Sequence, residues 1–188
     1  MISKLATAAF AATALSLGGC MTTAPQSGQA LSYVGGAAMY PTMTIVQNAV
    51  NSPDHTTLVA AVKAAGLVDT LSGAGPFTVF APTNNAFAKL PAGTVDSLVR
   101  PENKSTLQSV LTYHVVPGRV TAADLMSLIA AGGGQAQLTT VQGATLTARM
   151  MGNQVMLVDG KGGMSHVTQA DVMQSNGVIH VVDSVLMS

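Results

Sequence analysis

Two β-type segments, about a hundred residues apart, constrain the fold of this chain most strongly. The first, 77–87, reads FTVFAPTNNAF, and the second, 176–187, reads NGVIHVVDSVLM. In the first segment a short apolar strand is ended by Pro82, after which Thr83 or Asn84 can cap a short helix. The second segment contains the run of apolar residues that is typical of a buried strand. We therefore expect the apolar side chains of both segments to lie in the core.

The other local signals predict helices before the glycine run 132–134 and strands after it. Apolar residues at helical spacing predict helices over 42–50, 54–65, 102–111 and 124–131, with Asp54 as an N-cap and Gly66 as a terminator of the second. Strands are predicted at 77–81, 113–116, 136–141, 144–150, 154–158, 166–173 and 178–183. Asn176-Gly177 predicts a hairpin, because both residues tolerate the positive φ of tight turns. The predicted fold class is α+β.

A third segment, Tyr113 to Gly118 (YHVVPG), lies between the other two. In this order and spacing the three segments resemble the first box, the central Tyr-His motif and the last box of the fasciclin-type, or FAS1, domain. The resemblance covers about Met39 to Ser188. It implies the FAS1 fold, a wedge or sandwich of short β-strands with a cluster of helices packed against it. It also implies a scaffold that adheres and binds and is not an enzyme, and a scaffold by itself does not fix function.

The same resemblance implies four partner-binding residues. Tyr113 and His114 match the family's Tyr-His motif, which in animal members is linked to integrin-dependent adhesion. Asp171 and Val172 occupy the place of an Asp-Ile adhesion motif, although Val replaces Ile here and Gln-Ala at 169–170 replaces the polar or Pro-bearing pair of animal modules. For Tyr113 and His114 a structural role is the alternative, because a Tyr and a His inside a domain commonly satisfy each other or the backbone.

The first twenty residues predict a lipoprotein leader. Lys4 precedes an apolar run, 5–17, that is short for a bilayer span, and the run leads into Leu-Gly-Gly-Cys at 17–20. This end resembles a bacterial lipobox, so residues 1–19 are predicted to be a signal peptide and Cys20 the lipidated first residue of the mature chain. Because Met21 is not the Asp that retains similar lipoproteins at the inner membrane, the predicted location is the outer membrane.

Residues 20–38 are predicted to be a lipid anchor and flexible linker. The stretch 22–36 is rich in Thr, Ser, Gln, Gly and Ala, and it lacks apolar periodicity. Residues 39–188 are enough for one fasciclin domain with its own core. The expected state is a monomer that touches the membrane only through its N-terminal lipid.

The low content of charged residues argues against polyanionic partners. Only 9% of the residues are charged, with eight Lys and Arg against eight Asp and Glu. A basic surface for nucleic acid or anionic lipid is therefore not predicted. The expected partner is a cell-surface or matrix protein or a polysaccharide.

Motifs for catalysis, cofactors or zinc are absent from the sequence. The four histidines form neither His-Glu-x-x-His nor His-x-His, and no Gly-x-Ser-x-Gly marks a nucleophile. The segment 159–163, DGKGG, lacks the spacing of a nucleotide loop and the Ser or Thr after its Lys, so it is interpreted as a turn.

The leading hypothesis is thus a lipid-anchored envelope protein that mediates adhesion. The alternative is an envelope protein that binds a small molecule or a metal, and a hydrolase is the third class. Copper is the metal considered, because soft thioethers with an imidazole suit Cu(I). Core filling by methionine is the competing interpretation, since the chain is poor in aromatic residues. The candidate copper ligands are Met150, Met151, Met156, Met164 and His166.

Overall fold

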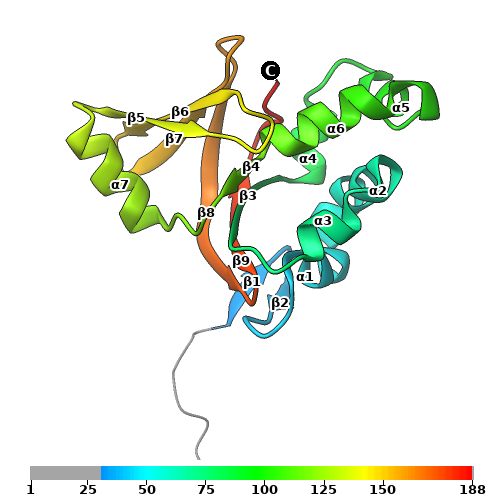
Figure 1. The fold of residues 1–188 in the computed structure, drawn as a ribbon, viewed down its shortest axis with the longest axis horizontal. Coiled ribbons are helices and arrows are strands. Elements are labelled where there is room, and N and C mark those ends of the chain that lie inside the picture. The colour runs from blue at the N-terminus through cyan, green and yellow to red at the C-terminus, as the bar shows by residue number, and fades with distance from the viewer. Residues whose placement is uncertain (1–30, 188) are drawn as a thin grey trace, which may run out of the picture.

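The computed structural model describes residues 31–187, which form one mixed sheet, one small hairpin and seven α-helices (Figure 1). The helices are α1 Ile45–Asn51, α2 Thr56–Ala65, α3 Val68–Ser72, α4 Asn84–Ala88, α5 Thr94–Leu98, α6 Lys104–Tyr113 and α7 Ala122–Ala131. The strands are β1 Ser32–Val34, β2 Ala37–Met39, β3 Phe77–Pro82, β4 Val115–Pro117, β5 Gln135–Thr139, β6 Thr145–Met151, β7 Gln154–Val158, β8 Met164–Gln174 and β9 Gly177–Val182.

The two segments that the sequence singles out lie side by side in the seven-stranded sheet, whose order is β4-β3-β9-β8-β7-β6-β5. β3 and β9 pair in parallel, with Phe77 opposite Gly177, and the other neighbours in this sheet are antiparallel. The long strand β8 links the two halves, because its first residues pair with β7 and its later residues with β9. The two edge strands, β4 and β5, also approach each other. The N–H of Val141, two residues after the end of β5, donates to the carbonyl of Val115 in β4 at 2.7 Å.

Alternate residues of β3 and β9 face two separate cores. Val79 and Ile179 belong to a core shared with α1, α2, α3 and α6, which cover one face of these strands. Phe80 and Val182 belong to a second core, shared with α7 and strands β5 to β8. Strands covered on both faces read as continuous apolar runs. The expected placement of both segments in the core, and the α+β FAS1 fold class, are therefore confirmed.

Two local predictions are wrong in position. Tyr113 is the last residue of α6, so the predicted strand at 113–116 begins only at Val115. Asp54 lies in a 3₁₀ turn, Pro53–His55, and is not the N-cap of α2. The first turn of α2 is instead satisfied from another segment, because the side-chain oxygen of Asn84 accepts from the N–H of Thr57 at 3.0 Å.

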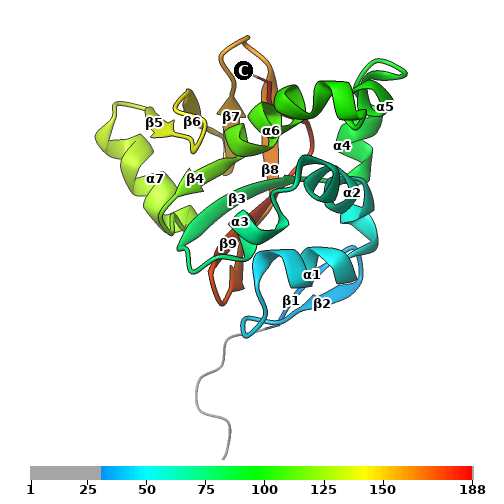
Figure 2. The same ribbon diagram turned by 45° about the vertical axis from the view of Figure 1, so that its right-hand side comes forward.

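The domain begins earlier than the predicted boundary at Met39. Strands β1 and β2 form an antiparallel hairpin beside α1, at one end of the molecule (Figure 2). The side chains of Val34 and Met39 are only 3% and 2% exposed in the first core. Residues 31–38 therefore belong to the domain and not to the linker predicted at 20–38. Cys20 and the predicted leader lie outside the described residues.

The predicted hairpin at Asn176-Gly177 is present, but neither residue has a positive φ. The turn residues are Ser175 and Asn176, and Gly177 already pairs with Gln174. Gly177 is needed for a different reason: a Cβ atom there would lie 2.0 Å from the carbonyl oxygen of Phe77 on the parallel strand. The glycine thus permits the close approach of β3 to β9.

Candidate functional site

Tyr113 and His114 lie in the interior. Tyr113 has no exposed surface; its hydroxyl donates to the carbonyl of Thr145 and accepts from the N–H of Gly160, both at 3.0 Å. Burial raises the pKa of Tyr113 above its usual value. The ring of His114 uses Nδ1 toward the carbonyl of Val110 at 2.8 Å. Both side chains are therefore satisfied by the backbone and are closed to a partner in this conformation.

A second buried imidazole, that of His180, connects three segments. Its Nε2 lies 2.8 Å from the carbonyl of Val120, and its Nδ1 accepts from the N–H of Asp171 at 3.3 Å. The ring stacks on Phe80, with 5.6 Å between the ring centroids. Because Nδ1 accepts a hydrogen bond, it carries no proton, and the ring is neutral. Burial lowers the pKa of His180 and favours the same neutral form. All three partners of His180 come from other segments and depend on tertiary packing.

Asp171 is the one partly exposed member of the four predicted contact residues. It lies where the pairing of β8 with β9 shifts register, and its φ is +57°, the one positive value of a non-glycine among residues 31–187. Its carboxylate accepts from the N–H of Ala122, in the first turn of α7, at 2.7 Å. A carboxylate is favourable at a helix N-terminus, so Asp171 holds α7 against the sheet bulge. The neighbouring Val172 has no exposed surface and is a core residue.

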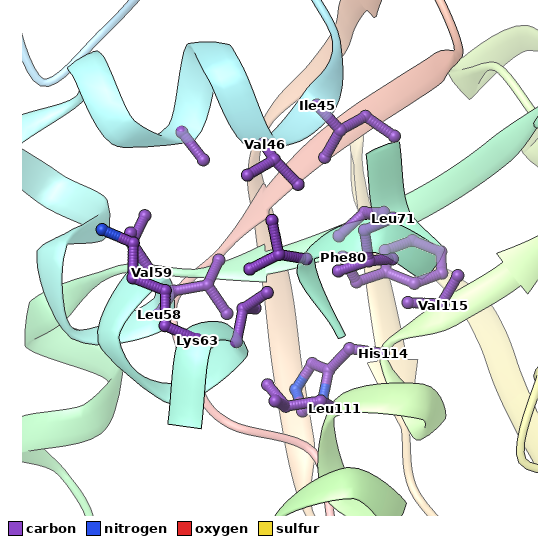
Figure 3. Close-up of a pocket in the computed structure, with 14 residues that line it drawn as sticks. Ile45, Val46, Leu58, Val59, Lys63, Leu71, Phe80, Leu111, His114 and Val115 are labelled. Atoms are coloured by element: carbon purple, nitrogen blue, oxygen red, sulfur yellow. The ribbon is translucent and has the colours of Figure 1, made fainter. Parts of the chain in front are cut away.

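A narrow apolar cavity lies between the helices and β3 (Figure 3). Its volume is about 30 Å³, whereas an apolar cavity that accepts benzene measures about 150 Å³. Polar groups come only from Lys63 and His114, and both ring nitrogens of His114 already have partners. Small-molecule sites combine a larger volume with several convergent polar groups. This cavity therefore does not support the small-molecule alternative. It is lined by Ile45, Val46, Ala49, Leu58, Val59, Val62, Lys63, Val68, Leu71, Val79, Phe80, Leu111, His114 and Val115.

The segment 159–163 is a turn, as predicted. The carboxylate of Asp159 accepts from the N–H groups of Lys161 and Gly163 within the turn, at 3.0 and 2.7 Å. Its other oxygen accepts from the N–H of Met187 at 3.0 Å. Asp159 therefore serves the fold by fixing the C-terminal segment. Across residues 31–187 no group of three or more His, Cys, Asp or Glu side chains is arranged to hold a metal ion.

The comparisons with known proteins agree with this architecture. The fasciclin domain profile matches residues 53–188 of the chain. The chain belongs to the fasciclin family. It is 50% identical over 154 residues to Protein sll1483 of Synechocystis sp., covering 82% of this chain and 78% of that protein. It is also 36% identical over 174 residues to the cell surface glycolipoprotein MPB83 of Mycobacterium bovis, covering 90% of this chain and 70% of that one.

A solved structure shows the same fold. It is a FAS1 domain pair from the insect cell adhesion molecule fasciclin I, with a TM-score of 0.69 and 20% identity. The similarity covers 78% of this chain and 51% of that one. In the part of the present chain that the structure describes, no helix is both long and apolar enough to cross a membrane.

Proposed function

We propose that this fasciclin protein is a lipid-anchored adhesion protein of the cell envelope, which binds a cell-surface protein, a matrix protein or a polysaccharide. The observation that carries the proposal is its 36% identity, over 90% of its length, to a cell surface glycolipoprotein. The lipobox-like segment ending at Cys20 agrees with attachment through lipid. The proposed location is the outer membrane, since Met21 follows the Cys.

The interior of the domain supports binding by the surface and not by a pocket. Tyr113, His114 and Val172 are buried, and the cavity beneath the helices is small and apolar. With 9% charged residues, the surface has little long-range field. Contact with a partner should therefore involve neutral polar and apolar groups, and it should change little between low salt and about 0.5 M salt, where exposed charges are screened.

The proposed contact is the edge formed by Gln169, Ala170 and Asp171 on β8 and the first turn of α7. These three residues are partly exposed at the bulge, where pairing with β9 is irregular. A non-glycine residue with positive φ is uncommon, and such residues cluster at functional sites. Asp171 also has a structural role through Ala122, so a test must separate the two roles.

Substitutions at Asp171 and Gln169 separate contact from stability. Asp171→Asn keeps an oxygen for the N–H of Ala122 and a side chain that tolerates positive φ, and it removes the charge. Asp171→Ala loses the helix cap and places Ala at an unfavourable φ, so it should destabilise the domain by roughly 1 to 3 kcal/mol. If the edge binds the partner through neutral groups, the Asn variant attaches cells or matrix as the wild type does and stays within about 1 kcal/mol of its stability. Gln169→Ala, at a partly exposed position, should change stability by less than about 0.5 kcal/mol and reduce attachment. Wild-type attachment by Gln169→Ala would remove this edge from the proposal.

The lipid anchor is tested separately with Cys20→Ala. Many anchored copies can engage a repetitive partner together, which raises avidity by orders of magnitude without any new contact. Cys20→Ala should abolish partitioning into detergent, leave the domain folded and reduce attachment of cells that express the protein. Equal detergent partitioning of the two proteins would disprove lipid attachment at Cys20. Equal attachment despite loss of the lipid would show that adhesion does not depend on anchoring of many copies in the membrane.

A further inference from the structure

Three of the five candidate soft ligands are brought together on one face of the sheet. Met164 and His166 are two residues apart on β8, so their side chains leave the same face. The register places Met156 on β7 directly opposite His166. The residues between them, Ser165 and Leu157, have no exposed surface and point to the other face. Cross-strand neighbours have Cβ atoms about 4.5–5.5 Å apart, so two thioethers and an imidazole can reach one point.

The face that carries these side chains is open to solvent. Met164 is 60% exposed, and the side chain of His166 is 38% exposed. A large apolar side chain exposed to this extent contributes little to the core. Filling of core gaps, the ordinary role of methionine, therefore does not explain Met164.

The imidazole of His166 has a carboxylate beside one of its two ring nitrogens. One carboxylate oxygen of Asp183 lies 3.6 Å from Nδ1, and the other accepts from the backbone N–H of His166 at 2.8 Å. Asp183 is held in turn by the ammonium of Lys89 at 3.1 Å. Among residues 31–187 no hydrogen-bond partner is found for Nε2 of His166. A carboxylate that faces the nitrogen opposite the metal is the usual support of a histidine ligand.

We propose that Met156, Met164 and His166 form a surface site for Cu(I). Two neutral thioethers and one imidazole suit a soft monovalent ion. The same three side chains offer no oxygen ligands for Mg²⁺ or Ca²⁺ and no thiolate for zinc. The proposal goes beyond adhesion and does not rest on it.

The strand register places the two other candidate ligands, Met150 and Met151, away from this site, and a hydrogen bond holds the nearby Arg149 toward β5. Met150 pairs with Val155, which is buried, so its side chain leaves the opposite face. Met151 shares the outer face but pairs with Gln154, at the far end of β7. The cation nearest in register is Arg149, opposite Met156, and its guanidinium donates to Gln135 on β5 at 2.9 Å. That bond directs the positive charge away from His166.

The test is an anaerobic titration of the full chain with Cu(I) against a coloured Cu(I) chelator. The chain carries Cys20→Ala in every sample, because a free thiol would bind the same ion. We expect one Cu(I) per chain. His166→Ala, Met156→Leu and Met164→Leu should each weaken binding by roughly tenfold or more. Leu preserves the volume of Met, so the two Met variants should remain folded.

Met126→Leu is the matched control, since Met126 is 45% exposed on α7 and lies outside the cluster. It should bind Cu(I) as the parent does. Failure of the parent to take one Cu(I) from the chelator overturns the proposal. Equal weakening by Met126→Leu and Met164→Leu, or unchanged binding by His166→Ala, also overturns it, because binding would then not depend on this site.

Discussion

The Nε2 atom of His114 accepts a hydrogen bond from the backbone N–H of Leu186, 72 positions further along the chain, at 3.0 Å. This bond joins the central Tyr-His motif to the last box of the domain. Because Nδ1 of the same ring bonds the carbonyl of Val110, His114 serves as a bridge between α6 and the C-terminal segment. Its role in this fold is to fix the chain end, which explains why a polar side chain is buried here.

Replacement of His114 should therefore lower stability and not adhesion as such. His114→Ala leaves the N–H of Leu186 and the carbonyl of Val110 without their partner, and it opens space in the core. We expect a loss of roughly 2 to 4 kcal/mol in the free energy of unfolding, measured by urea denaturation. His166→Ala, at a partly exposed position, should cost less than about 1 kcal/mol. A His114→Ala protein as stable as the wild type would contradict the bridging role.

The buried histidines should also make the domain sensitive to mild acid. Burial lowers the pKa of His114 from 6.5 to about 4, and it lowers the pKa of His55 and His180 as well. Below pH 6.5 the unfolded chain binds protons at these rings while the folded chain does not, so stability falls as the pH falls. Between pH 7.5 and pH 5.0, His114 alone should account for a loss of about 2 kcal/mol.

Urea denaturation at the two pH values measures this loss. His114→Gln does not titrate, so its stability should fall less than that of the wild type over the same interval. The aspartates with lowered pKa, Asp124 and Asp183, titrate below this interval, from an ordinary value of 3.8. Equal pH dependence in the wild type and His114→Gln would show that His114 is not the source.

Asn176 should be among the least replaceable polar residues of the domain. Its side-chain oxygen accepts from the N–H of Ile45 at 3.0 Å, and its amide donates to the carbonyls of Leu71 and Gly73 at 2.8 and 3.0 Å. Asn176→Asp keeps the shape but places an acceptor against two carbonyls. We expect a loss of roughly 2 to 4 kcal/mol in thermal or urea unfolding. Asn51→Ala, at an exposed position, is the control and should change stability by less than about 0.5 kcal/mol.

Features that depend on neighbouring residues could be predicted from the sequence, whereas features that depend on residues far apart in the chain could not. The strand at Gln154–Val158 and the helix cap at Thr83 were predictable because a short apolar run between turn residues and a capping residue are local signals. The roles of Asn84 and Asn176 were not, since each side chain satisfies backbone groups of segments distant in sequence. Burial of Tyr113 could be anticipated only as an alternative to surface contact.

The candidate copper ligands show the same limit. Five soft or imidazole side chains cluster along the sequence, and only the strand register selects Met156, Met164 and His166 as neighbours. The bulge at Asp171 likewise has no local signature, because its positive φ follows from the pairing shift between β8 and β9. The chemistry of these side chains could be read from the sequence, whereas which of them are neighbours depends on how the strands pair in the sheet.

The N-terminal hairpin should be required for a stable domain, although three-residue strands give too little periodicity to be predicted. Val34 packs in the first core, and its carbonyl accepts from the hydroxyl of Ser52 at 3.3 Å. A chain truncated to 39–188 should therefore be less stable than one that begins at Leu31, by roughly 3 kcal/mol or more, because it loses a buried side chain and the strand partner of β2.

Point variants on β1 test the same contact without truncation. Val34 is 3% exposed, and the preceding Tyr33 is 59% exposed on the other face. Val34→Ala should lower the free energy of unfolding by roughly 1 to 2 kcal/mol, while Tyr33→Ala should change it by less than about 0.5 kcal/mol. Urea denaturation of the two variants measures the difference. If both variants and the truncated chain unfold as the wild type does, the hairpin adds nothing to the core and the domain starts at Met39 after all.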